Sequence, residues 1–388
     1  MGNGIELYRT ILTLLVRTIP HSAYGHLGRL YTLAWAVVGL LLEKCVSLPA
    51  WATVIQSRAR YAASRYRRLH RWLRNEKVNP QAIYGPLIQA ALAKWSEVFV
   101  YVALDTTVLW NKFVVIRASL VYRGRAIPLA WKVLKHASAS VAFADYAPVL
   151  RRAAQLLPAN WDVTLLADRG FCDEKLFPLL KELGWHLRIR GKGSLLVYRK
   201  GKKGCKMARL CPRRGEARFI HNVYITRQRI GPVHLALAWP ATGENDPWYI
   251  ISDEPTNLDT FAEYGLRVDF EESILDDKSN AFQVQKSEID SADDLSRLFL
   301  VLAIGTLYLV STGVEVVKKG LRRLVDTHWD RGLSYLKIGW RWLRRQLWLG
   351  LPLPHSMELD PAPDPEPARA SRRTHRSPPT FKVVAGEC

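Results

Sequence analysis

The sequence predicts an α/β fold, a mixed β-sheet flanked by helices, and three observations carry this prediction. Short apolar runs at residues 98–104 and 163–167 have the length and composition of buried strands. Residues 113–122 and 125–134 are two longer strand-like segments that follow one another. Apolar residues recur at helical spacing over 141–157, which lies between the segments 125–134 and 163–167.

The elements follow in a simple order. Gly124 marks a tight turn between the second and third strands, so the first three strands are expected to be consecutive and antiparallel. After the strand at 163–167, we expect a helix over 173–183 that ends at Gly184, and a further strand near 185–190. The predicted order is three strands, a helix, a strand, a helix and a strand.

A helix further along the chain is predicted to carry functional side chains on one face. Tyr264, Arg267, Glu271 and Lys278 lie at offsets of three, seven and fourteen residues from the first. On an α-helix they fall within an arc of about 60°. The pattern favours a carboxylate that holds a metal ion beside cations that bind phosphates, and the alternative is a charged surface helix.

Two aspartates complete an acidic set. Asp105 and Asp168 come at or near the ends of the strands at 98–104 and 163–167, and chemistry in α/β sheets collects at the carboxyl ends of strands. Together with Glu271 they form a triad of oxygen ligands suited to divalent metal. Taken singly, an aspartate at a strand end is more often a turn or a helix cap, which is our interpretation of Asp162 and Asp173.

These motifs resemble those of DDE transposases of bacterial insertion sequences, specifically the insertion-sequence-four type. The resemblance rests on Asp105 in LDTT, Asp168 in LLADRGF and a Y-(2)-R-(3)-E-(6)-K signature over 264–278, and it covers about residues 95–320. It implies a ribonuclease-H-like core of the retroviral integrase superfamily. It also implies that Asp105, Asp168 and Glu271 are the catalytic and metal-binding residues, with two Mg²⁺ ions that Mn²⁺ can replace.

The same resemblance implies contacts with DNA. Tyr264, Arg267 and Lys278 are expected to contact the DNA ends. In the related transposases, a tryptophan in the strand before the catalytic helix receives a base flipped out of the DNA, and Trp248 matches that placement. The alternative for Trp248 is an ordinary core tryptophan. Between Asp168 and that strand, residues 191–245 exceed what a compact core needs and contain strand-like segments, which predicts an inserted β subdomain.

Composition indicates a nucleic-acid partner independently. The chain has 56 Lys and Arg against 35 Asp and Glu, a net charge of +21, which favours salt-dependent binding to phosphates. Arginines concentrate at residues 58–74, where offsets of 0, 7, 11 and 14 would place four of them on one helical face, namely Arg60, Arg67, Arg71 and Arg74. We interpret this segment as a DNA-contacting helix, and the alternative is a solvated helix that only aids solubility.

The expected organisation has five parts. They are a helical DNA-binding domain (1–94), a catalytic core (95–190 and 246–320), the inserted β subdomain (191–245), a basic C-terminal helix (321–350) and a disordered tail (351–388) with eight prolines. Five scattered cysteines predict neither a disulfide framework nor structural zinc, and fit a reducing cytoplasm. The apolar run 298–317 is expected to be a buried helix, and the alternative is a membrane span.

The sequence thus predicts a DNA transposase that cleaves DNA at the ends of an insertion sequence and joins them to target DNA by two-metal phosphoryl transfer. The expected partners are double-stranded DNA with terminal inverted repeats, target DNA and a second protomer, with no membrane. The expected location is the cytoplasm, in association with the nucleoid. The alternative is a non-transposing metal-dependent nuclease, or a DNA-binding protein, of the same fold.

Overall fold

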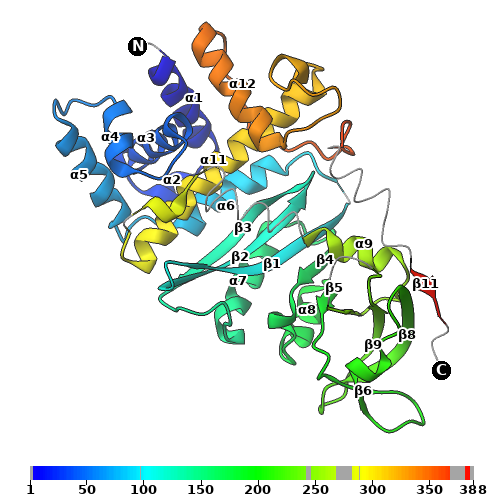
Figure 1. Ribbon diagram of the computed structural model, residues 1–388. Coiled ribbons are helices and arrows are strands. Elements are labelled where there is room, and N and C mark those ends of the chain that lie inside the picture. Colours follow the sequence, from blue (N-terminus) through cyan, green and yellow to red (C-terminus); the bar gives the residue numbers. More distant parts are fainter. Residues whose placement is uncertain are drawn as a thin grey trace.

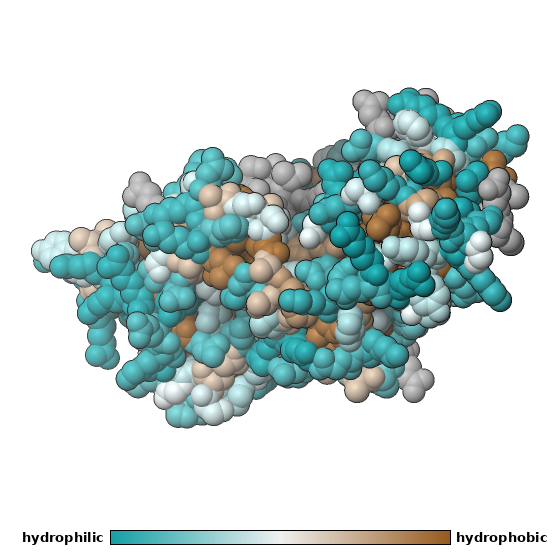
Figure 2. Space-filling view, turned by 90° about the horizontal axis from the view of Figure 1, so that it is seen from below, coloured by the Kyte–Doolittle hydropathy of each residue, from teal (hydrophilic) through white to brown (hydrophobic). Residues whose placement is uncertain are grey.

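A computed structural model describes residues 3–96, 98–241, 246–267, 282–287, 289–367 and 381–384 (Figure 1). Helices from the two ends of the sequence gather on one side of a long β-sheet, and the sheet runs away from them to a β-rich end (Figure 1). The lower face of the molecule is largely hydrophilic, with small apolar patches between polar side chains (Figure 2). In the part of the chain that the structure describes, four short 3-10 helices join the larger elements: η1 (Arg169–Phe171), η2 (Met207–Leu210), η4 (Val284–Lys286) and η5 (Arg322–Leu324).

The first half of the sheet has the strand order β3-β2-β1-β4-β5. The strands β1, β2 and β3 are antiparallel neighbours, whereas β4 is parallel to β1 and β5 is parallel to β4. Nine of the ten residues of β2 are buried, as expected of a strand covered on both faces. The strands are β1 (Phe99–Leu109), β2 (Phe113–Tyr122), β3 (Arg125–Leu134), β4 (Asp162–Ala167) and β5 (His186–Arg190).

Two helices connect these strands in the predicted order. Helix α7 (Phe143–Leu156) contacts β2 and β3 and leads into β4, and α8 (Leu176–Leu183) leads into β5. Helix α8 ends at Gly184, whose φ of 68° is a left-handed conformation that glycine adopts at low cost. The predicted sequence of three strands, helix, strand, helix and strand is confirmed.

The second half of the sheet continues from β5 in the order β10-β9-β8-β6-β7. Strand β10 is antiparallel to both β5 and β9, so it joins the two halves. The segments predicted as strands between residues 191 and 245 are strands, and they extend the same sheet. They are β6 (Leu196–Tyr198), β7 (Cys205–Lys206), β8 (Glu216–Ile225) and β9 (Ile230–Ala238), followed by β10 (Trp248–Ser252).

The helical side is organised around α11 (Ala292–Lys318), which is buried along nearly its whole length. Its apolar window is long enough to cross a membrane, but 94% of that window is buried inside the protein, as expected for a core helix. The bent pair of α3 and α4 also passes the length and composition test when taken together. The N-terminal helices are α1 (Asn3–Thr18), α2 (His21–Tyr24), α3 (Leu27–Glu43), α4 (Leu48–Val54), α5 (Ala62–Leu73) and α6 (Pro80–Ala91).

Helix α12 (Tyr335–Leu349) packs against α11 at two glycines. A Cβ atom on Gly313 would lie 2.0 Å from the carbonyl oxygen of Tyr335, and one on Gly339 would lie 1.9 Å from that of Leu309. The two backbones therefore touch, and only hydrogen fits between them at these positions.

The expectation of a disordered tail from residue 351 is wrong for residues 351–367. Leu353, Met357 and Leu359 are buried, and the Leu359 amide donates to the carbonyl of Ala91. Trp95 donates its indole N–H to the Leu359 carbonyl at 2.8 Å. The prolines remove helix and sheet propensity, but the apolar residues between them give this extended segment anchors in the core.

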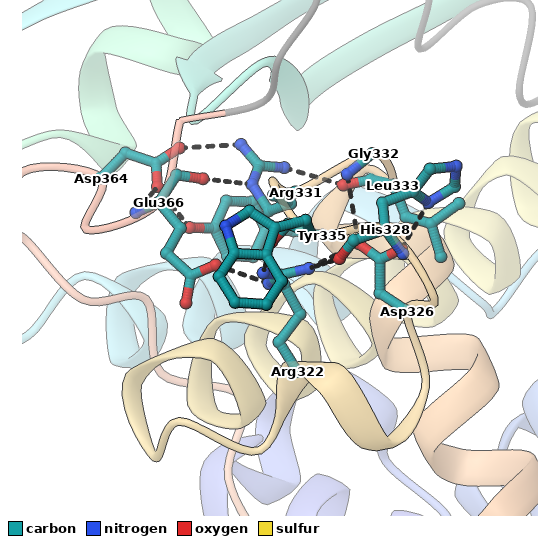
Figure 3. Close-up of polar contacts among 10 residues, drawn as sticks. Arg322, Asp326, His328, Arg331, Gly332, Leu333, Tyr335, Asp364 and Glu366 are labelled. Carbon is teal, nitrogen blue, oxygen red and sulfur yellow. Dashed lines mark hydrogen bonds and ion pairs between the residues drawn. The ribbon is translucent and has the colours of Figure 1, made fainter.

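Acidic residues hold the next part of the tail (Figure 3). Asp364 accepts from the Arg331 guanidinium at 3.0 Å and from the Tyr335 hydroxyl at 2.5 Å. Glu366 pairs with Arg322 at 2.5 Å, and both arginine side chains are less than 7% exposed. Buried guanidinium groups need such partners, because an unpaired buried charge is strongly destabilising.

Candidate functional site

Asp105 and Asp168 each come directly after the last residue that two neighbouring parallel strands, β1 and β4, pair with one another. The register pairs Leu104 of β1 with Ala167 of β4, so the next residue on each chain is one of the two aspartates. Adjacent strands are about 4.8 Å apart. The sheet therefore brings two carboxylates together that are 63 residues apart in the sequence.

The expectation that Asp105 ends its strand needs correction. Strand β1 continues to Leu109, and Asp105 pairs with Arg117 of β2. What ends at Leu104 is the pairing of β1 with β4. Asp105 thus lies where β1 separates from β4, while β1 remains paired with β2 on its other side.

Thr106 and Arg267 donate hydrogen bonds to the carboxylate of Asp105. The backbone N–H of Thr106 donates to Oδ1 at 2.7 Å, and the Arg267 guanidinium donates to Oδ2 at 2.9 Å. The side chains of Asp105 and Arg267 are only 16% and 14% exposed. This ion pair is shielded from solvent, so it is stronger than a surface pair.

Helix α9 (Asp259–Gly265) carries Tyr264 and leads to Arg267. Glu263 on this helix pairs with Arg188 of β5 at 2.7 Å, which fixes the helix over the sheet. The Arg267 guanidinium lies 6.0 Å from the centre of the Tyr264 ring. Burial raises the pKa of Tyr264 to about 12, and the nearby Arg267 opposes this shift. Tyr264 is therefore a neutral phenol packed beside the cation.

The remaining members of the predicted helical face, Glu271 and Lys278, lie outside the described residues. The structure brings Tyr264, Arg267 and Asp105 together, and the pKa of Tyr264 responds to the charge of Asp168. Two carboxylates that follow the paired residues of neighbouring strands are suitable ligands for Mg²⁺, a hard cation that binds oxygen. A metal ion could bind Oδ2 of Asp105 only if Arg267 moved away, because the guanidinium donates to this oxygen.

A second cluster of potential metal ligands, one histidine and two acids, lies at the opposite end of the strands from Asp168. His186, Asp253 and Glu254 have potential metal ligands within 4.8 Å of one another. His186 begins β5, whereas Asp168 follows the far end of β4, so the two groups are separate. The sequence analysis did not predict this group, and the only local signal is the Asp-Glu pair that follows β10.

The contacts of this group give it a structural role, because they join the residues after β10 to β5. Asp253 accepts from the amide of Leu187 at 2.9 Å and contacts His186 Nδ1 at 2.8 Å, while Glu254 pairs with Arg188 at 2.9 Å. Partial burial opposes protonation of His186, but the hydrogen bond and charge of Asp253, with the charges of the nearby acids, outweigh it and raise the pKa of the imidazole. All three groups already have protein partners.

Trp248 begins β10 and lies in a small aromatic cluster. Its ring centre is 6.1 Å from that of Phe261 on α9, and Phe261 is in turn 5.9 Å from Phe219 of β8. Trp248 is half-buried. Because β10 is antiparallel to β5, with Ile250 opposite Arg190, Trp248 lies beyond the carboxyl end of β5. It is therefore at the same edge of the sheet as Asp168.

The four predicted DNA-contacting arginines are all exposed, but they do not share one helix. Helix α5 begins at Ala62, after Tyr61 in an extended conformation, so Arg60 precedes it. Arg67 and Arg71 lie on α5, and Arg74 is its C-terminal cap and pairs with Asp294 at 3.7 Å. The helix buries Leu69, Trp72 and Leu73 on its other face, which leaves the arginines toward solvent.

No known protein family matches the chain, and no curated protein matches it. Among solved structures, one similar chain comes from a cryo-EM structure of the piggyBac transposase synaptic complex with hairpin DNA. The two share 11% sequence identity with a TM-score of 0.44, over 96% of this chain and 87% of that chain.

Proposed function

We propose that this protein is a DNA transposase of the DDE type, with a ribonuclease-H-like core. The observation that carries the proposal is the placement of Asp105 and Asp168 directly after the last paired residues of two neighbouring parallel strands, next to Arg267. The strand order β3-β2-β1-β4-β5, with three antiparallel strands first, agrees with the core that the sequence motifs imply. The reaction would be cleavage at the ends of an insertion sequence and joining of those ends to target DNA.

The proposed roles follow from the positions of the side chains. Asp105 and Asp168 would hold Mg²⁺ with Glu271, and Mn²⁺ would substitute. When bound, the metal would supply Lewis-acid activation of the attacking and leaving oxygens. Arg267 would exchange its carboxylate partner for a DNA phosphate, since a guanidinium binds either anion in the same bidentate way.

Other groups would position the DNA. Lys278 would bind a phosphate, and Tyr264 would support Arg267 through its ring while it packs in the core. Trp248 would stack on a base that is flipped out of the DNA duplex, because its half-buried ring lies at the same end of the strands as Asp168. The exposed arginines Arg67 and Arg71 would contact the backbone of flanking DNA, and the net charge of +21 favours that association.

Assembly and location also belong to the proposal. Two protomers would act on paired ends that carry terminal inverted repeats, so that each end is cut and joined within one complex. The protein would work in the cytoplasm on the nucleoid. The second candidate is a metal-dependent nuclease, or a DNA-binding protein, of the same fold, and the same two carboxylates favour the nuclease over pure binding.

The test uses the natural DNA context. A linear fragment with the coding region and its flanks is incubated with the purified protein and Mg²⁺, and the new 3′ ends are mapped by sequencing. A target plasmid is included to capture joined products. We expect cuts at two fixed positions that bracket the coding region, and insertions in the plasmid. Scattered cuts without joining would support the nuclease, and binding without cuts by wild-type protein would overturn the enzyme.

A further inference from the structure

The C-terminal residues 381–384 return to the β-rich end of the sheet and dock beside β8 (Figure 1). The short strand β11 (Lys382–Val383) is parallel to β8 and pairs with Glu216 and Ala217. The Lys382 amide donates to the Gly215 carbonyl and the Val384 amide donates to the Ala217 carbonyl, both at 2.9 Å. This is strand addition, in which an extended peptide completes the edge of a sheet.

Phe381 anchors this segment in the aromatic cluster. Its ring centre lies 5.3 Å from that of Phe261, the residue that also contacts Trp248 and Phe219. Ala217, Ala236 and Ala238 are fully buried in the same apolar cluster. Their small side chains leave room above the sheet, and the aromatic rings fill that room.

The attachment is weak by its own structure. Only two residues pair with β8, and Val383 is 53% exposed. An exposed hydrogen bond contributes little net stability, because water competes for the same groups, so the packing of Phe381 supplies much of the affinity. Such a segment can leave its site without disturbing the core.

We propose that the β8 edge and the Phe261 cluster form a peptide-binding site, whose occupant is the chain's own segment Phe381–Val384, and that the occupied site competes with a DNA base at Trp248. Phe381 and Trp248 contact the same ring, Phe261, and pack against one apolar cluster, so a base that entered this cluster beside Trp248 would compete with Phe381 for the contact with Phe261. The competition rests on the proposed function, whereas the peptide site does not.

The first experiment tests the peptide site without DNA. A chain that lacks residues 381–388 is titrated with a fluorescent peptide of residues 379–385, and binding is followed by anisotropy. A tethered segment acts at an effective concentration of roughly millimolar, so the titration extends to that range. We expect saturable binding, lost when Phe381 of the peptide is changed to Ala and kept with Val383→Ala. Absence of binding, or equal binding by both altered peptides, would overturn the site.

The second experiment tests the competition. Affinity is measured for a duplex with one unpaired base and for the fully paired duplex, in the full chain and in the variants Phe381→Ala and Val383→Ala. We expect Phe381→Ala to bind the unpaired-base duplex several-fold more tightly and Val383→Ala to match the full chain. Added peptide should reverse the gain. Equal affinity in all three chains would overturn the competition, even where the peptide binds.

Two further results distinguish the proposed peptide site from failure of the proposed function and from exchange of the segment between two copies of the chain. If no variant binds DNA, the proposed function fails, and the anisotropy titration alone still decides the peptide site. If loss of residues 381–388 converts a dimer into a monomer in light scattering, the segment is exchanged between two copies, and the proposal of a self-ligand within one chain is overturned.

Discussion

The Arg267 guanidinium donates to Oδ2 of Asp105 across 162 residues of sequence, and this ion pair closes the candidate site. It joins the end of the β1–β4 pairing to the segment that follows α9. A metal ion and Arg267 would compete for the same carboxylate oxygen. The arrangement therefore suggests that Arg267 leaves Asp105 when DNA phosphate and metal enter together.

Asp105→Asn and Asp168→Asn should each reduce DNA cleavage by roughly 10²-fold or more, the scale of losing one charge-stabilising group in an active site. The amide keeps the shape of the side chain but is a poor metal ligand. DNA affinity in the absence of metal should change little. Asp162→Asn is the matched control, because Asp162 is exposed at the other end of β4. Normal cleavage by Asp168→Asn would remove that residue from the site.

Arg267→Ala should lower the thermal midpoint, because Asp105 loses the guanidinium that donates to its Oδ2 inside a shielded site. We expect a loss of about 1–3 kcal/mol. Added Mg²⁺ should raise the midpoint of this variant more than that of wild type, because ligand binding to the native state stabilises it. The double variant Asp105→Asn/Arg267→Ala should lose the Mg²⁺ effect, and an identical Mg²⁺ shift in wild type and Arg267→Ala would contradict the competition.

Neutralising Arg67 and Arg71 to Gln should flatten the dependence of log K on log salt by up to about 0.9 for each lost phosphate contact. Both arginines are exposed on α5, so the fold should be unaffected. Lys175 and Lys181, exposed near α8, are the control pair of equal charge. If both double variants change the slope equally, attraction depends on net charge and α5 has no special role.

His186 should make stability depend on pH. Its pKa is raised in the folded protein, so its contribution is fully present below the unfolded pKa of about 6.5 and is lost as pH rises through the folded pKa. The thermal midpoint should therefore fall between pH 6 and pH 8 by more in wild type than in His186→Gln. Parallel curves for the two proteins would show that the contact with Asp253 carries no charge-dependent stability.

Gly313→Ala should destabilise the protein by about 1–3 kcal/mol or more, because its methyl group would meet the Tyr335 carbonyl and force α11 and α12 apart. Gly170→Ala provides the control, since a Cβ there meets nothing within 4 Å. The comparison is made by thermal unfolding. A Gly313→Ala protein as stable as the control would mean that the two helices can separate freely.

Local patterns predicted much of this fold. The bounds of β2 and β3 agree with the predicted hairpin, because two apolar runs and the glycine turn between them lie in adjacent residues. The buried state of α11 followed from its apolar composition and the polar residues near its end. The prediction that Arg60 lies on α5 is wrong, because the arginine spacing begins two residues before Ala62, where the backbone becomes helical.

Contacts between distant segments were beyond such patterns. The parallel register that brings Asp105 near Asp168 depends on how two strands meet, and the pairing of Arg267 with Asp105 depends on where α9 crosses the sheet. The ordered part of the tail was missed because prolines dominate its composition. Its order depends on the hydrogen bond from Trp95 to the Leu359 carbonyl and on the ion pair between Asp364 and Arg331.

The continuous sheet has a mechanical consequence for the inserted strands. A separate β unit could swing on two linkers, but β9 and β5 are both hydrogen-bonded to β10, so the insertion cannot rotate without breaking a ladder. Four strand-to-strand steps lead from β4 to β8, and a twist of about 20–25° at each step turns the strand direction by roughly 80–100°. The sheet thus holds β8 at a fixed orientation relative to β4, the strand before Asp168. A duplex that follows the insertion would have to bend or approach along that fixed angle.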